Sequence, residues 1–145
     1  MLLKGSLSIP DGSDRVWDFV SDPAKVIQCV PGLQSYTVGE GKRVSASVKV
    51  SVGFIRGTFQ TVSRIIREDK SAKVAVLELT GSGAGSGFSA VVTLSVSGNS
   101  KESQLTWEAD AKVSGPLGSL AKPLIEGNIR KIVDQLFDCV KAKLG

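Results

Sequence analysis

Apolar and polar residues alternate along much of this sequence, which is the pattern of strands with one buried face. In residues 44–52 every second residue is valine or alanine, and the residues between them are serine or lysine. Residues 105–113 repeat the pattern, with Trp107 on the apolar side and Glu108 on the polar side. Strands of a parallel sheet are buried on both faces, so this alternation predicts an antiparallel sheet.

Further strands are predicted at both ends of these segments. The predicted strands cover residues 3–9, 44–52, 55–66, 74–79, 88–96 and 105–113, and strand-like sequence begins at Leu33. Short runs rich in glycine, serine, asparagine or aspartate separate them, and every link from Leu33 onward is short enough for a hairpin. A meander is therefore the simplest topology.

Helices are predicted after the first strand and at the C-terminal end. Ser13 is a candidate N-cap for a short helix, and Asp22 and Pro23 are a candidate cap and first residue for a second. From Leu117 to Leu144 apolar residues recur at helical spacing, with Pro123 predicting either a kink or a new start. The sequence thus predicts an α+β fold in which a curved antiparallel sheet wraps around a long C-terminal helix and encloses a cavity.

Length and composition predict one domain over residues 1–145, since 41% of the residues are hydrophobic and 22% are charged. The chain has no histidine, which excludes a His-dependent triad and makes a zinc site unusual. We therefore expect no catalytic set, no metal and no cofactor.

The net charge of +4 is scattered along the chain and no aromatic residue is interleaved with the basic ones, so nucleic acid is not an expected partner. No apolar run reaches the ~18 residues of a membrane span, which leaves the cytoplasm as the expected compartment, with peripheral contact to anionic lipid compatible with the charge. Cys29 and Cys139 lie on apolar helical faces, and we expect both to be free thiols.

Several short motifs resemble one family when taken in order. They are the first strand, Val16-Trp17-Asp18-Phe19, Asp22-Pro23, Val30-Pro31-Gly32, Val52-Gly53-Phe54-Ile55, and Val113-Ser114-Gly115-Pro116-Leu117 before the long helix. Together they resemble the carbon monoxide dehydrogenase G-subunit family, within the START-like, Bet v 1-like (SRPBCC) helix-grip superfamily. The resemblance implies an accessory protein of a molybdenum-containing oxidoreductase that places the enzyme at the membrane or handles quinone-like lipids. Many such proteins carry a further C-terminal tail, whereas this sequence stops at Gly145 after the helix, so we expect ligand holding rather than anchoring.

Three functions follow as hypotheses: a carrier of a hydrophobic small molecule, an adaptor for a molybdenum hydroxylase-type oxidoreductase, and a cyclase- or hydratase-like enzyme. The carrier is preferred, because an enzyme needs an inward acid or base and the inward positions are nearly all apolar. The residues expected to contact the ligand are Ile27, Val30, Phe59, Leu77, Phe88, Trp107, Leu120, Leu124 and Asn128.

Two of these expectations leave alternatives open. Asn128 lies on the apolar face of the long helix, where its amide bonds either a strand backbone or trapped water, or else orients a polar group of the ligand. The glycine-rich residues 81–87 lack the lysine of a phosphate loop, so they indicate a hairpin or a glycine-weakened strand, with a flap over the cavity as the functional alternative.

Overall fold

The structure is a computed structural model that describes residues 1–53 and 55–144, apart from the Val52 side chain. Phe54, one of the residues that carry the family resemblance, lies outside the described residues. The elements in chain order are β1 (Leu2–Ile9), α1 (Ser13–Val20), α2 (Pro23–Val26), η1 (Ile27–Cys29), β2 (Leu33–Val38), η2 (Glu40–Lys42), β3 (Val44–Val52), β4 (Ile55–Asp69), β5 (Val74–Gly83), β6 (Ser86–Gly98), β7 (Ser103–Ser114), η3 (Pro116–Ser119) and α3 (Lys122–Leu144).

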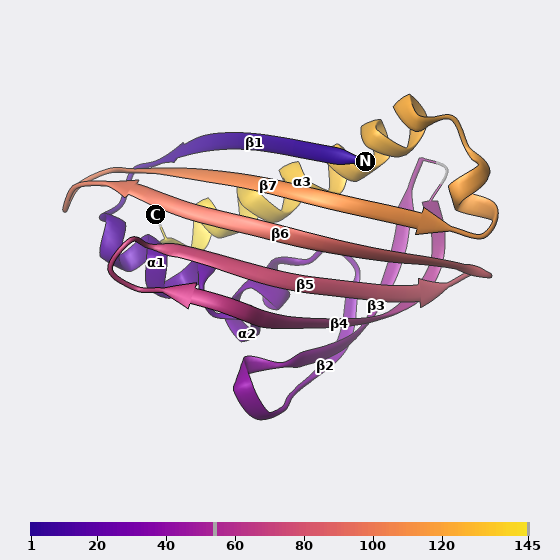
Figure 1. Ribbon diagram of the computed structural model, residues 1–145, viewed down its shortest axis with the longest axis horizontal. Helices are drawn as coiled ribbons and strands as arrows, with labels where there is room; N and C mark the ends of the chain where they lie inside the picture. Colours follow the sequence, from indigo (N-terminus) through magenta and orange to yellow (C-terminus); the bar gives the residue numbers. More distant parts are fainter. Residues whose placement is uncertain (54, 145) are drawn as a thin grey trace.

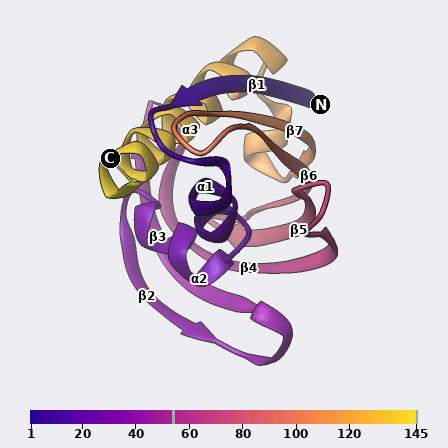
Figure 2. The same ribbon diagram turned by 90° about the vertical axis from the view of Figure 1, so that its left-hand side faces the viewer.

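The strands form one antiparallel sheet of seven strands in the order β1-β7-β6-β5-β4-β3-β2 (Figure 1). The predicted meander from β2 to β7 is confirmed. The first strand pairs with the last, from Leu2 opposite Asp110 to Ile9 opposite Ser103, so β1 and β2 are the two edges. Figure 2 shows the sheet curling from β1 to β2, with the helices on its concave side. The predicted α+β fold, a curved sheet around a long C-terminal helix, is therefore confirmed.

The N-terminal end of α1 differs from the prediction. Gly12, not Ser13, is the N-cap, and no side chain caps the helix. The Ser13 amide donates to the Asn99 carbonyl at 2.8 Å, and a Cβ on Gly12 would lie 2.7 Å from the Ser100 carbonyl oxygen. The expected Ser13 cap was wrong because this contact with the β6–β7 loop, which is distant in sequence, fixes where the helix begins.

The start of α2 agrees with the prediction. The Asp22 carboxylate accepts from the Ala24 amide at 3.0 Å, and Pro23 occupies the first helical position. These contacts direct the chain so that η1 follows immediately after the helix, next to α3.

The C-terminal segment is divided before the long helix. The short η3 ends at Ser119, and α3 starts anew with Pro123 in its first turn, where proline has no helical hydrogen bond to lose. The new start, rather than a kink, is therefore the correct alternative. Ile125 and Val140 are among the helix residues buried against the sheet.

The glycine-rich residues 81–87 form the tip of the β5–β6 hairpin. Ala84 and Gly85 both have positive φ, 52° and 75°, as a two-residue turn that follows the twist of the strands requires. The predicted hairpin is confirmed, and the glycines at its start extend β5 to Gly83.

Candidate functional site: an apolar cavity under the long helix

A cavity of about 660 Å³ lies between the concave face of the sheet and α3, with α2 and η1 along one side. Its volume is within the ~300–1,000 Å³ usual for small-molecule sites. The described lining is mostly aliphatic and aromatic: inward side chains of β3 to β7 form the floor, and the helix contributes Ile125, Ile129, Ile132, Val133 and Leu136. This arrangement suits an apolar ligand, because burial of apolar surface on both sides of it is favourable.

Small side chains on the central strands leave the space open. Ala90 on β6 lies opposite Ala111 on β7, and Val92 lies opposite Ala109 in the next inward row. All four line the cavity. Protein interiors are normally packed without voids of this size, so alanines at three of these positions are a direct cause of the unfilled volume.

Two aromatic pairs line the cavity. The rings of Phe59 and Phe88 have centroids 6.4 Å apart, and those of Trp107 and Phe137 are 6.2 Å apart. The Phe88 ring lies over Gly81, where a Cβ would overlap it. In the same way Trp107 lies over Gly5 on the neighbouring strand, where a Cβ would be 2.9 Å from the indole. Glycine at these two positions therefore lets each ring lie flat against the sheet.

Most of the residues expected from the sequence lie around this cavity. The lining includes Ile27, Val30, Phe59, Leu77, Phe88, Trp107, Leu120 and Asn128. Leu124 does not belong to it: its side chain is 43% exposed, and Ile125 takes the inward position in that turn. The expected place of Leu124 was wrong because the inward stripe of α3 runs through residues 125, 128, 129 and 132, and Leu124 falls at its margin.

The Asn128 amide is buried and bonded within its own helix. Its Nδ2 donates to the Leu124 carbonyl at 2.7 Å, so the partner is neither a strand backbone nor a water. The same amide lies against Gly53 in the β3–β4 turn, where φ is +55° and a Cβ would overlap Oδ1. Asn128 thus joins the helix to this turn, and its role toward a ligand stays a prediction.

Charged side chains are directed away from the cavity. Glu108, Asp110 and Lys112 on β7 are exposed on the outer face, as the alternation predicts. Lys49 is the one ionisable residue among the described lining, and it is exposed, because Val48 and Val50 take the inward positions of β3. Within the described ranges there is no group of three or more His, Cys, Asp or Glu side chains that could hold a metal.

Inward hydroxyl groups are the feature that sequence reasoning missed. Phe59, Thr61 and Ser63 occupy successive inward positions of β4, and the two hydroxyl residues line the cavity half-buried. The Thr61 Oγ1 donates to the Ala46 carbonyl at a long 3.4 Å. The signal was present in the sequence, because Phe59 fixes the inward parity of this strand.

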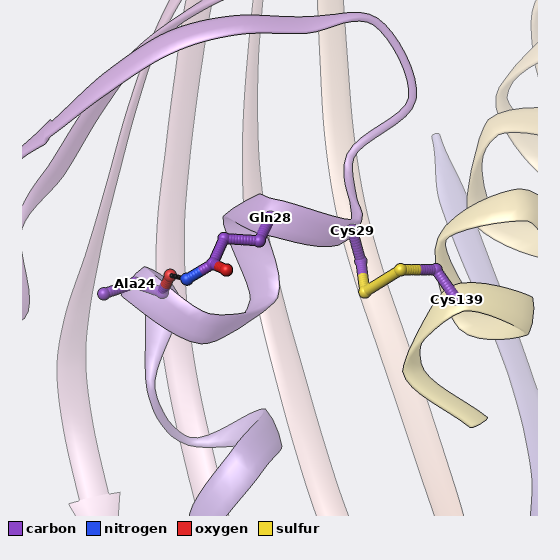
Figure 3. The surroundings of a disulfide bond; sticks show 4 residues. All are labelled: Ala24, Gln28, Cys29 and Cys139. Carbon is purple, nitrogen blue, oxygen red and sulfur yellow. Dashed lines mark hydrogen bonds between the residues drawn. A yellow bond between two sulfur atoms is a disulfide. The ribbon is translucent and has the colours of Figure 1, made fainter. Parts of the chain in front are cut away.

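A disulfide joins Cys29 in η1 to Cys139 in α3, with the two Cα atoms 5.4 Å apart (Figure 3). The expected free thiols were wrong: the fold brings together residues that are 110 positions apart, a distance in sequence at which no pairing is visible. The Gln28 Nε2 donates to the Ala24 carbonyl at 3.1 Å and supports the same short segment. Disulfides persist mainly in oxidising compartments, so this bond opposes the cytoplasmic location expected from the sequence.

Comparisons with known proteins agree with this geometry. Residues 5–145 match the family described as the carbon monoxide dehydrogenase G subunit (CoxG). A comparison with curated proteins finds no match. No helix in the described ranges is long and apolar enough to cross a membrane.

Solved structures share the architecture at low sequence identity. A conserved protein from Geobacillus kaustophilus has a TM-score of 0.90 and 18% identity, over 99% of this chain and 95% of that one. The Zhui aromatase/cyclase from Streptomyces sp. R1128 has a TM-score of 0.71 and 13% identity, over 99% and 93%. A START superfamily protein from Mycobacterium smegmatis has a TM-score of 0.70 and 13% identity, over 99% and 96%. The fold is therefore the START-like helix-grip fold.

Proposed function

The chain belongs to the CoxG family of carbon monoxide dehydrogenase, and we propose that it carries a hydrophobic small molecule, lipid-like or quinone-like, between the sheet and α3. The observation that supports this most is the cavity of about 660 Å³ with its apolar lining. We further propose that residues 1–145 act as one domain, because the cavity is built from elements at both ends of the chain, from Leu3 to Val140.

The proposal favours holding a ligand over converting it. Neighbours on this fold include an aromatase/cyclase and a norcoclaurine synthase, at 13% and 14% identity, so the fold alone is compatible with catalysis. Conversion by general acid–base catalysis needs a titratable side chain within reach of the ligand. The charged residues of β7 instead face outward, and Lys49 is exposed.

The direct test is identification of co-purified lipids by mass spectrometry, followed by titration of the delipidated protein with an apolar fluorescent probe. We expect a Kd in the micromolar range or better, which corresponds to about 8 kcal/mol. The variant Ala109→Leu should reduce probe binding by placing a larger side chain in the cavity floor. The matched control is Ala142→Leu, on an exposed position of α3. A flat titration of the parent protein with several probes would refute the carrier.

Two further variants test the cavity wall. Trp107→Ala should weaken probe binding, whereas changes at the exposed Arg130 and Lys131 should not. Because truncation of a buried tryptophan costs about 3–5 kcal/mol of stability, folding of this variant is checked first by thermal unfolding. Asn128→Leu changes volume little and removes the amide; unaltered affinity in a folded Asn128→Leu variant would remove Asn128 from the ligand contacts.

Family membership favours a second role, as an adaptor for a molybdenum hydroxylase-type oxidoreductase. A carrier that delivers a quinone-like molecule needs such a redox partner, so the two roles are compatible. If the adaptor role dominates, changes at Arg130 and Lys131 should abolish capture of the purified oxidoreductase, and Ala109→Leu should leave it intact. The opposite result would leave the carrier alone.

A further inference from the structure

The inward hydroxyls of β4 are the polar groups on the cavity wall that no other element explains. Thr61 lies between Ala46 on β3 and Gly81 on β5, both of which are too small to cover its side chain. Ser63 lies between Val44 and Leu79, which have no hydrogen-bonding side-chain atoms. The pair therefore forms a small polar patch within an apolar wall, which we call the hydroxyl patch.

Neighbouring strands do not satisfy the hydroxyl patch. Among the described residues the Thr61 hydroxyl has one hydrogen-bond partner, the Ala46 carbonyl, which is 3.4 Å away, at the long limit for an O–H···O bond. Within the same ranges the Ser63 side chain takes part in no hydrogen bond to protein, while it lines the cavity half-buried. A valine and an alanine would pack equally well here, so packing alone does not account for two hydroxyls.

Hydroxyl groups select the chemistry of what they contact. Each can donate one hydrogen bond and accept others, which matches a carbonyl oxygen or another hydroxyl. An ionised head group would need an opposite charge, because burying an unpaired charge is far more costly than burying a neutral polar group. The charged residues of β7 face outward and the Lys49 side chain is exposed, so the described lining offers an ionised head no inward partner.

Aromatic rings stand next to the hydroxyl patch. Phe59 precedes Thr61 by one inward position, and the Phe88 ring lies over Gly81, the β5 partner of Thr61. These two rings form one of the aromatic pairs, with centroids 6.4 Å apart. A flat head that carries a carbonyl would therefore have ring faces and a hydrogen-bond donor on the same side of the cavity.

We propose that the hydroxyl patch of Thr61 and Ser63 binds the polar end of an uncharged ligand through its carbonyl or hydroxyl oxygen, and that the cavity excludes ionised amphiphiles. This inference rests on the proposed carrier function and adds the class of its ligand: a neutral molecule with one polar end. The apolar remainder lies between the alanine floor and α3.

The test uses ligands of one chain length and different ends, which displace an apolar fluorescent probe from the delipidated chain at pH 7.5. The ligands are dodecane, 2-dodecanone, 1-dodecanol and laurate. We expect the ketone and the alcohol to bind at least tenfold more tightly than laurate. In the variant Thr61→Val/Ser63→Ala, the ketone and the alcohol should weaken about tenfold, and the affinities of the probe and of dodecane should stay unchanged.

A matched control carries the same changes on the outer face. Thr80 and Ser89 are exposed and lie opposite each other on β5 and β6, so Thr80→Val/Ser89→Ala should leave all affinities unchanged. Thr61→Ser retains a hydroxyl and should retain ketone binding. The single variants Thr61→Val and Ser63→Ala give the same test if the double variant fails to fold.

The outcomes separate the two proposals. Failure of the parent to bind probe or any ligand would overturn the carrier and the hydroxyl patch together. Normal probe binding with laurate as tight as dodecanol, or with ketone and alcohol binding unchanged in every folded hydroxyl patch variant, would overturn the hydroxyl patch and leave the carrier standing.

Discussion

The Cys29–Cys139 disulfide should make a large contribution to stability, and its size follows from where it lies in the chain. It joins residues 110 positions apart, so it closes a loop that includes most of the sheet. In the chain-entropy description, a cross-link over such a loop restricts the unfolded chain by about 5 kcal/mol at 25 °C. Measured losses on removing native disulfides are about 2–5 kcal/mol, so we expect a value in that range.

The perturbation is made in two independent ways, by a dithiol reductant and by the variant Cys29→Ala/Cys139→Ala. Urea unfolding of oxidised and reduced parent should differ by about 2–5 kcal/mol in the free energy of unfolding. At about 2–4 °C per kcal/mol for a chain near this length, Tm should fall on the order of 10 °C. Reductant should have no effect on the cysteine-free variant, which serves as the control.

Two results would refute this reasoning. Thiol counting on the denatured, unreduced protein should return no free thiol, and two free thiols per chain would show that the bond does not form. Equal unfolding midpoints for oxidised and reduced parent would show that the disulfide forms without constraining the unfolded chain.

Three other changes give separate expectations. Leu105→Ala, at a fully buried position, should cost about 2–5 kcal/mol in urea unfolding, and a cost below 1 kcal/mol would contradict its place in the core. Gly53→Ala should cost more than the roughly 1–2 kcal/mol of a positive-φ alanine, because Asn128 occupies the added space; Gly41→Ala, with positive φ and nothing within 4 Å, isolates the backbone part, and equal costs would refute the contact. Ala109→Leu should leave Tm unchanged or raise it, and a fall of several degrees would show that the space is already filled.

The fold could be predicted from the sequence because its information is local. Strict alternation in residues 44–52 and 105–113 assigns each strand its inward face, and short links between strands leave the meander as the simplest order. Asp22 and Pro23 act on backbone groups one or two residues away, so their roles were visible as well. Ser13 failed as a cap because the Gly12 contact with the β6–β7 loop is set by tertiary structure.

The site was only partly predictable, since a cavity depends on what lies opposite each residue. The apolar wall was found from inward parity, as Phe59 and Trp107 show. That Ala109 leaves space unfilled follows only when the distance to α3 is known. The disulfide likewise needs the placement of η1 beside the helix.

The buried core has two parts, and the cavity borders both. The larger cluster includes Leu3, Leu94, Trp107 and Val140, and the smaller one consists of Ile27, Val44, Ala46 and Val48; most of these residues also line the cavity.

The residues that pack least well are found on the cavity wall. Ala109, Thr61 and Ser63 occupy inward positions where larger apolar side chains would increase burial and join the two clusters directly. Packing favours leucine or valine at such positions, so alanine and hydroxyl residues there lower the stability of the empty protein. A ligand with an apolar body and one neutral polar end would fill the same space, contact both clusters and satisfy the hydroxyls, which is why the weakest part of the core is also the best candidate for the binding site.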